Sequence, residues 1–329
     1  MPLKATSPTR RRTLLKLTSW GAILAAPRLA VGQKPTFLIV PVPPGGGMDA
    51  TARLLAELMR PALGMVVVDN KPGAALRIGL QAVRGGSADG STMLYTSISP
   101  FTIYPFVYKK LGYDAERDLV PVAPVVSYEF ALAVPGNSPI SSVAEYVQAA
   151  RTDPGKSGLY AVPGAGTSVH FTGAALARAA GIDLNHVPYK GSAPAMQDLI
   201  GGNVPACVNV LGEFLQYRGT GKVKVLATTG ARRSPFMPDV PTFSELGFKG
   251  MALNEQFGVF LPGNTPAATV SKVSAAILAA VRQPEFVRRV GELGYTTLPM
   301  NPQDFAAKLQ ADRAAWEPIV RATGFTLED

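Results

Sequence analysis

The feature that most constrains the fold is a unit of apolar strand, glycine-rich turn and amphipathic helix that occurs twice. The first copy, TFLIVPVPPGGGMDATARLLAEL, covers residues 36–58, and the second, GLYAVPGAGTSVHFTGAALARAAG, covers residues 158–181. Further strand-like runs alternate with helical patterns along the chain, which is typical of α/β proteins with largely parallel sheets. Two such units, far apart in one chain, predict two lobes that each offer a helix N-terminus.

A glycine-rich turn between a strand and a helix is a typical anion-binding site. Glycine lets the backbone approach the anion closely, and the first N–H groups of the helix have no partner within it. Any anion of suitable size could use the first turn, where Gly45, Gly46 and Gly47 precede Asp49. The turn therefore predicts an anion site without identifying the anion.

The positive charge of the chain is concentrated at its start. The chain has 329 residues, of which 47% are hydrophobic and 17% are charged, and this is enough for two globular domains. Six of its 32 Lys and Arg residues lie in the first 32 positions, which contain no Asp or Glu, so 26 remain against 23 acidic residues. Because this remainder is nearly balanced, we expect no nucleic-acid partner.

Residues 1–32 have the pattern of an export signal. A basic start precedes a charge-free stretch, and Ala30 and Gly32 stand at the spacing that signal peptidase favours, which predicts a mature start at Gln33. The stretch is too short to span a bilayer, which takes about 20 apolar residues. Two adjacent arginines fit twin-arginine export, and an ordinary export signal is the alternative. Without a Cys at the cleavage point for a lipid, either route predicts a protein free in the periplasm.

No motif for catalysis stands out in the chain. It has no phosphate-binding G-x-x-x-x-G-K-[ST] loop, no dinucleotide fingerprint and no G-x-S-x-G nucleophile turn. His170 and His186 lack the spacing of a zinc site, and Cys207 has no second cysteine to pair with. His170 is either a structural imidazole or a donor that faces a cleft, whereas we expect His186, at the head of a strand, to be structural. We therefore predict a binding protein with no catalytic residue, metal or cofactor.

The stretch LIVPVPPGGGMDATARLLAELM resembles the solute-binding receptors of tripartite tricarboxylate transporters, the TctC or Bug family. Further stretches agree with this family in the same order along the chain: NKPGAALRIG, YPFVYKKLGYDAERDLVPVA, GAGTSVHFTGA, HVPYKGSAPAMQDLIGG and ATTGARRSPFMPDVPTFSELG. The resemblance covers essentially the whole chain after the export signal, and the ordered occurrence of these motifs makes it specific.

The resemblance implies a periplasmic binding protein-like α/β fold (type II), with two α/β lobes joined by a hinge that the chain crosses twice. We place the crossings near Val134 and near Phe257. Lobe 1 would then consist of residues 33–134 and 258–329, and lobe 2 of residues 135–257. A small carboxylate would bind in the cleft between them.

The resemblance also implies which residues hold the carboxylate through backbone N–H groups, hydroxyls and ordered water. In lobe 1 the motif positions are Gly45, Gly46, Gly47, Asp49, Thr96 and Ser97. In lobe 2 they are Ala165, Gly166, Thr167, Ser168 and His170. Simpler roles stay open, because glycines permit tight turns, Asp49 favours a helix N-terminus, and Thr167 or Ser168 can cap a helix. A weakly paired Asp49 would repel an anion, so we expect it to act through water or to bind a ligand N–H or O–H.

Two departures from the family pattern concern the ligand. The usual PGAGGNIG reads PGAALRIG at residues 72–79, which replaces two glycines and puts Arg77 where Asn is usual. The usual Asp-Asn pair reads Asn209-Val210, which removes a carboxylate. If both positions face the cleft, a second anionic group of the ligand would be bound by Arg77. The alternative is that Arg77 is a solvated surface cation.

The leading hypothesis is a receptor that captures a small carboxylate by lobe closure and delivers it to the membrane permease subunits of a tripartite tricarboxylate transporter. One alternative is a receptor that presents its ligand to a sensor kinase. Another is a periplasmic enzyme that acts on a carboxylate, with His170 as general base. An amino acid, a dicarboxylate, a citrate-like acid or an aromatic acid could each bind through one carboxylate at these turns, so the identity of the ligand is left open. We expect a monomer.

Overall fold

The computed structural model describes Met1 and residues 35–328. Residues 35–328 lie within one compact unit. The expected export signal, Met1 excepted, and the expected cleavage position before Gln33 lie outside the described residues. In the described part of the chain, no helix combines the length and the apolar character needed to cross a lipid bilayer.

Strands and helices alternate along the described residues. The strands are β1 (Thr36–Val40), β2 (Val66–Asn70), β3 (Thr92–Ser97), β4 (Leu119–Pro135), β5 (Leu159–Val162), β6 (Asn185–Pro188), β7 (Cys207–Val210), β8 (Val223–Thr228), β9 (Asn254–Pro262) and β10 (Thr296–Thr297). The helices are α1 (Gly47–Leu63), α2 (Arg77–Arg84), α3 (Ser99–Thr102), α4 (Tyr104–Val107), α5 (Val143–Thr152), α6 (Ser168–Ala180), α7 (Ser192–Gly201), α8 (Gly212–Leu215), α9 (Ala267–Val281), α10 (Pro284–Glu292) and α11 (Pro302–Thr323).

The described strands form a ten-stranded sheet in the order β2-β1-β3-β9-β4-β7-β5-β6, with β8 and β10 paired to β4. β1 is parallel to β2 and β3, and β5 is parallel to β6 and β7. The central strands β4 and β9 are antiparallel to each other and to their other neighbours. The expectation of largely parallel sheets is thus right for the outer strands and wrong for the centre, where β4 and β9 join the two halves.

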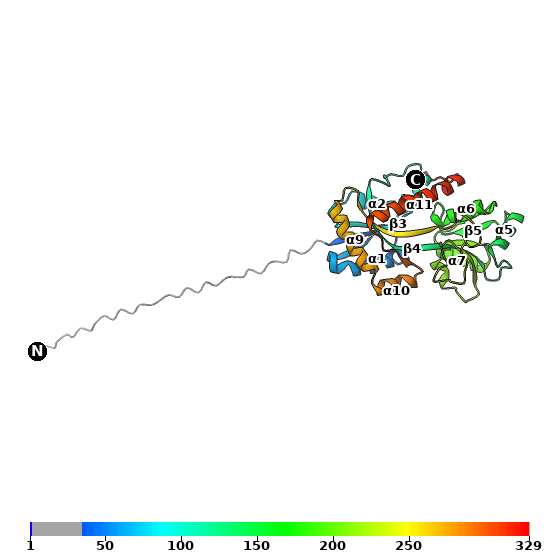
Figure 1. The fold of residues 1–329 in the computed structure, drawn as a ribbon, viewed down its shortest axis with the longest axis horizontal. Coiled ribbons are helices and arrows are strands. Elements are labelled where there is room, and N and C mark those ends of the chain that lie inside the picture. The colour runs from blue at the N-terminus through cyan, green and yellow to red at the C-terminus, as the bar shows by residue number, and fades with distance from the viewer. Residues whose placement is uncertain (2–34, 329) are drawn as a thin grey trace. The chain divides into compact units, whose positions relative to one another are not determined.

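β4 is long enough to belong to both halves of the sheet. It pairs with β9 from Leu119 to Glu129, and with β7 and β8 from Phe130 to Pro135. Figure 1 shows α1, α2 and α9 around the half that contains β3, and α5, α6 and α7 around the half that contains β5. The hinge crossings near Val134 and Phe257, and the lobe boundaries based on them, stay predictions.

The helices pack on the sheet through the faces that the hydrophobic periodicity predicts. α1 buries Ala52, Leu55 and Met59 and ends before Gly64. α11 lies across both halves, because it packs against α3 and α9 in one half and against α6 in the other, and its buried Trp316 contacts the ring of Phe130 on β4. These contacts place the C-terminal ends of β1 and β5, and the turns that follow them, within one compact unit.

Candidate functional site

The first glycine turn leads from β1 into the start of α1. Gly46 is the N-cap residue of α1 in an extended conformation, and no side chain caps this helix. Gly45 has a φ of 101°, in the left-handed region that favours glycine. A Cβ atom built on Gly45 or Gly46 would meet nothing within 4 Å. The turn that leads into α1 therefore borders open space at Gly45 and Gly46.

Asp49 fixes the shape of this turn. Its carboxylate is 3% exposed and accepts hydrogen bonds from the Gly45 N–H, Arg53 Nε and Asn70 Nδ2, each at 2.9 Å. Burial acts to raise the pKa of Asp49, but these hydrogen bonds outweigh it, so the pKa lies below its ordinary value. Asp49 is fully paired within the protein, unlike the weakly paired acid considered from the sequence, and its contact with a ligand stays a prediction.

Gly47, the first residue of α1, packs closely against the side chain of Tyr295. A Cβ atom on Gly47 would lie 2.3 Å from Tyr295 Oη. The Tyr295 ring packs against Tyr128 and Phe257, with centroids 5.5 and 5.6 Å away. This aromatic cluster therefore supports the start of α1, and sequence reasoning missed it because Tyr295 is separated from Gly47 by most of the chain.

The second turn leads from β5 into α6 and has its own internal bonds. Thr167 caps α6, because its hydroxyl donates to the Gly164 carbonyl at 2.8 Å and accepts from the His170 N–H at 3.4 Å. His170 Nδ1 accepts from the Gly166 N–H at 3.2 Å. Thr167 thus has the simpler role of a helix cap. Ala165, between Gly164 and Gly166, is half-buried.

His170 lies in an aromatic cluster. Its ring centroid is 3.8 Å from that of His186 and 5.0 Å from that of Phe325. All three residues line a cavity of about 500 Å³ between α6, β6 and α11. Burial, and next the neighbouring His186, lower the pKa of His170 to about 4. The geometry gives His170 a structural role as a neutral imidazole, and its contact with a ligand stays a prediction.

Glu255, on β9, links the two regions that the sequence assigns to the ligand. Its Oε1 accepts from the Ser99 N–H at 3.1 Å and from the Ser99 hydroxyl, and its Oε2 accepts from the Ser168 hydroxyl. The residue is 2% exposed. Burial raises the pKa of Glu255, and the hydroxyls of Ser168, Ser99 and Ser97 act in the opposite direction. Sequence reasoning missed Glu255, because an acid between Asn254 and Gln256 at the start of β9 gives no local signal of a site.

Thr96 and Asn209 are buried and each keeps an unpartnered polar atom. Thr96 is 1% exposed, and its Oγ1 has no hydrogen-bond partner among residues 35–328. Asn209 is fully buried, and its Oδ1 accepts from the Val210 N–H at 2.8 Å and from Ser192 Oγ at 3.3 Å. Its Nδ2 has no partner in the part of the chain that the structure describes. Because buried polar groups are nearly always paired, both atoms point to a missing partner.

Arg77 begins α2 and is already engaged. Its guanidinium lies 4.3 Å from the centroid of the Tyr108 ring, and its Nε donates to the Ala74 carbonyl at 3.0 Å. The two positions where the family usually has glycine, Ala75 and Leu76, have φ values of 49° and 74°. A left-handed backbone conformation costs a residue other than glycine roughly 1–2 kcal/mol. The Arg77 side chain helps to hold this strained turn, and its contact with a ligand stays a prediction.

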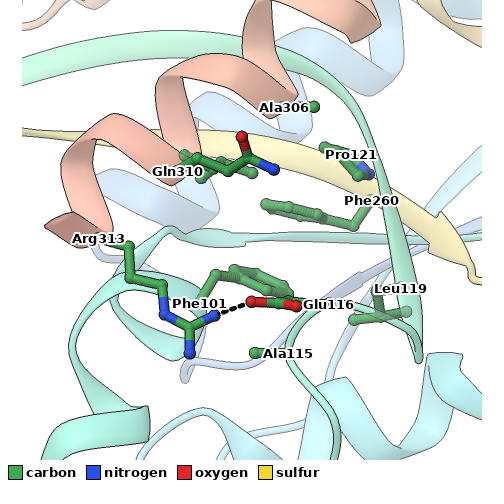
Figure 2. Close-up of a pocket in the computed structure, with 10 residues that line it drawn as sticks. Phe101, Ala115, Glu116, Leu119, Pro121, Phe260, Ala306, Gln310 and Arg313 are labelled. Atoms are coloured by element: carbon green, nitrogen blue, oxygen red, sulfur yellow. Dashed lines mark hydrogen bonds and ion pairs between the residues drawn. The ribbon is translucent and has the colours of Figure 1, made fainter.

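A separate cavity of about 340 Å³ lies between α11 and the segments that precede β4 (Figure 2). Phe101 and Phe260 line it, and their rings stack with centroids 4.1 Å apart. Arg313 of α11 forms an ion pair with Glu116, drawn as a dashed line in Figure 2. None of the predicted ligand residues lines this cavity. Within residues 35–328, no group of three or more His, Cys, Asp and Glu side chains could hold a metal ion.

Residues 51–325 match the model of the tripartite tricarboxylate transporter family receptor. The chain belongs to this receptor family. A related UPF0065 protein, from the tcbD-tcbE intergenic region of Pseudomonas sp. strain P51, is 34% identical and covers 94% of each chain. Protein BugT of Bordetella pertussis is 30% identical, over 90% of this chain and 91% of BugT.

Solved structures of similar proteins agree with the fold of this receptor. The periplasmic binding protein BugD is 33% identical, with a TM-score of 0.75 over 89% of this chain and 98% of BugD. R. palustris Rpa4515 with adipate is 29% identical, with a TM-score of 0.79 over 89% and 98% of the two chains. MatC from Rhodopseudomonas palustris with bound malate is 27% identical, with a TM-score of 0.75 over 87% and 99%. The predicted periplasmic binding protein-like α/β fold is therefore confirmed.

Proposed function

We propose that this receptor captures a small carboxylate in a cleft between two lobes and delivers it to the membrane permease subunits of a tripartite tricarboxylate transporter. One observation carries the proposal. At the ends of β1, β3 and β7 the chain has an uncapped helix start and two buried side-chain donors without a partner, Thr96 Oγ1 and Asn209 Nδ2.

Each of these groups suits a carboxylate. An uncapped helix start presents N–H groups and the positive end of the helix dipole to an anion. A buried hydroxyl or amide N–H without a partner costs about 1–3 kcal/mol, and a ligand oxygen would remove this cost. Because a carboxylate accepts several hydrogen bonds at once, one ligand group can satisfy donors from both halves of the sheet.

Relatives support this ligand class. R. palustris Rpa4515 was solved with adipate and MatC with malate, and both share the fold of this receptor. Adipate and malate are small acids of the kind that an uncapped helix start would hold. The ligand of this chain is accordingly proposed to be a small organic acid.

Lobe closure would follow from the position of the donors. With lobe boundaries near Val134 and Phe257, Thr96 belongs to lobe 1 and Asn209 to lobe 2. A ligand that bonds to both residues gains its full set of contacts only when the lobes approach each other. Since a ligand shifts an equilibrium only by its different affinity for the two states, these shared contacts would drive closure.

The remaining parts of the proposal concern the setting of the receptor. We propose that residues 1–32 direct it to the periplasm, where it acts as a monomer that binds its ligand without chemical conversion. Membership of the receptor family supports this role. The sequence contains no motif for a nucleophile or a metal site that would support an enzyme.

A ligand screen tests the proposal. The chain from Gln33 is unfolded and refolded to remove any carried ligand, and mono-, di-, tri- and aromatic carboxylates are screened by thermal shift and then by calorimetry. We expect at least one acid to bind with a dissociation constant of about 1 μM or lower and to be recovered unchanged. A folded protein that binds no organic acid, or that converts the acid, would contradict the proposal.

The variant Thr96→Val locates the binding site. Valine has the shape of threonine, and the lost hydroxyl has no protein partner, so we expect unchanged or slightly higher stability. Affinity for the best acid should fall about 5- to 30-fold, as for the loss of one hydrogen bond of about 1–2 kcal/mol. Thr265→Val is the matched control, because its buried hydroxyl is also unpartnered but lies beyond the other end of β9. Equal affinities in both variants would place the ligand elsewhere.

A further inference from the structure

Glu255 is a buried acid that is bound by residues of the predicted ligand site. Its carboxylate accepts from Ser168, which the sequence assigns to the ligand, and from Ser99, two residues after Ser97. Ser97 itself pairs with Phe257 across β3 and β9. Ser168, which was expected to hold the carboxylate of the ligand, therefore holds a carboxylate of the protein.

Within the described part of the chain, Glu255 has no basic partner to neutralise it. Among the ion pairs of residues 35–328, none includes Glu255. Its oxygens accept from the hydroxyls of Ser99 and Ser168 and from the Ser99 N–H, and the hydroxyls of Ser97 and Tyr128 also act on it. None of these donors carries a full positive charge. In such a buried place the ionised form of Glu255 repels a second anion and attracts a cation much more strongly than it would in water. A bound cation would therefore favour this ionised form, against the burial that raises the pKa of Glu255.

Glu255 and the start of α1 lie at the same edge of the sheet. β1 and β3 are parallel, and α1 follows the C-terminal end of β1. β9 is antiparallel to β3, so Glu255, near the N-terminal end of β9, lies at that edge too. Because neighbouring strands are about 4.8 Å apart, β9 lies roughly 10 Å from β1 across β3. A small ligand with its carboxylate at the start of α1 would extend toward Glu255.

We propose that Glu255 determines the charge of the ligand, so that this receptor binds a small acid whose second polar group is an ammonium or a neutral donor. The inference rests on the proposed function, since it assumes a ligand carboxylate at the start of α1. An ammonium would donate to a remaining lone pair of Glu255 and neutralise it, whereas a second carboxylate would be repelled. This ligand class differs from the second anionic group that the sequence suggested for Arg77.

Matched pairs of ligands test the proposal on the wild-type protein. Each dicarboxylate from succinate to adipate is compared with the ω-amino acid in which an ammonium replaces one carboxylate, such as succinate with β-alanine. Affinities are measured by calorimetry near pH 8, on protein that has been unfolded and refolded. For the pair of the best length, we expect the amino acid to bind at least about tenfold more tightly than the dicarboxylate. A dicarboxylate that binds as tightly, or more tightly, overturns the proposal.

The variant Glu255→Gln tests whether Glu255 is the cause of this preference. Glutamine keeps the shape and one acceptor oxygen but removes the charge, so the preference for the amino acid should fall at least about tenfold. Glu129→Gln is the matched control. Glu129 is an acid on the neighbouring strand β4, opposite Asn254, and bonds neither to Ser99 nor to Ser168. We expect this control to keep the wild-type preference.

The outcomes separate the two proposals. If carboxylates bind without the charge preference, or if Glu255→Gln changes all affinities by the same factor, Glu255 is only structural and the inference fails while the receptor function stands. If no acid of either kind binds, the proposed function fails and the inference fails with it. Should Glu255→Gln not fold, the wild-type comparison of each pair still decides the matter.

Discussion

The variant Asp49→Asn tests whether Asp49 holds the first glycine turn in place. The carboxylate accepts hydrogen bonds from Gly45, Arg53 and Asn70, each at 2.9 Å. Asparagine keeps one of the two oxygens, so at least one of these bonds is lost and an NH₂ group faces a donor. The loss of a hydrogen bond to a buried charged group lowers the free energy of unfolding by about 1.5–3 kcal/mol. The half-exposed ion pair with Arg53 adds little to this value.

The effect of Asp49→Asn should depend on pH. The pKa of Asp49 lies below its ordinary value of 3.8 in the folded protein, so its ionised form is stabilised by folding. This contribution is fully present above about pH 5 and is lost as the pH falls through the folded-state pKa. The stability difference between wild type and variant should therefore be constant from neutral pH down to about pH 5 and shrink toward pH 3.

Urea unfolding at a series of pH values measures this difference directly. The reasoning predicts that the two proteins differ by about 2 kcal/mol at neutral pH and by less at pH 3. Two results would refute it. One is equal stability at neutral pH, which would mean that the three hydrogen bonds do not support the turn. The other is an equal difference at both pH values, which would mean that the charge of Asp49 is not involved.

Three further predictions concern the surroundings of the site. In urea unfolding, Gly47→Ala should lower the free energy of unfolding by about 1–3 kcal/mol, because its Cβ would lie 2.3 Å from Tyr295 Oη. The control Gly46→Ala, whose Cβ meets nothing within 4 Å, should leave the free energy of unfolding nearly unchanged. Arg77→Ala should lower Tm while the relative affinities for mono- and dicarboxylates stay the same in calorimetry; a selective loss of dicarboxylates would instead make Arg77 a ligand residue. The pKa of His170 is lowered from 6.5 to about 4 in the folded protein, so the unfolded chain takes up a proton first and the folded protein loses stability as the pH falls from 6.5 to 4. In urea unfolding over this pH range, His170→Phe should lose less stability than the wild type.

Local features of the fold follow from the sequence because neighbouring residues determine them. The run from Gly47 to Leu63 has a helical pattern and a glycine stop, and it forms α1. Thr167 stands before a helical pattern and caps α6 through its hydroxyl. The order of the strands in the sheet, however, depends on contacts between distant segments, so the antiparallel centre of the sheet was missed.

The same distinction explains the site. Glu255 bonds to Ser99 and Ser168, which are 156 and 87 residues away in the sequence. No local pattern indicates such a contact, so an acid at the centre of the predicted ligand residues was overlooked. The pairing of Asp49 with Asn70, 21 residues away, escaped prediction for the same reason. The glycine turns of the site were thus predictable from the sequence, but the hydrogen-bond partners of Asp49 and Glu255 were not.

The most direct test of the central claim is a crystal structure of the refolded protein with its best-binding acid. The account predicts that one carboxylate of the ligand lies about 2.7–3.2 Å from the first N–H groups of α1 and from Thr96 or Asn209. A ligand bound instead in the cavity beside Arg313, which none of the predicted ligand residues lines, would contradict it.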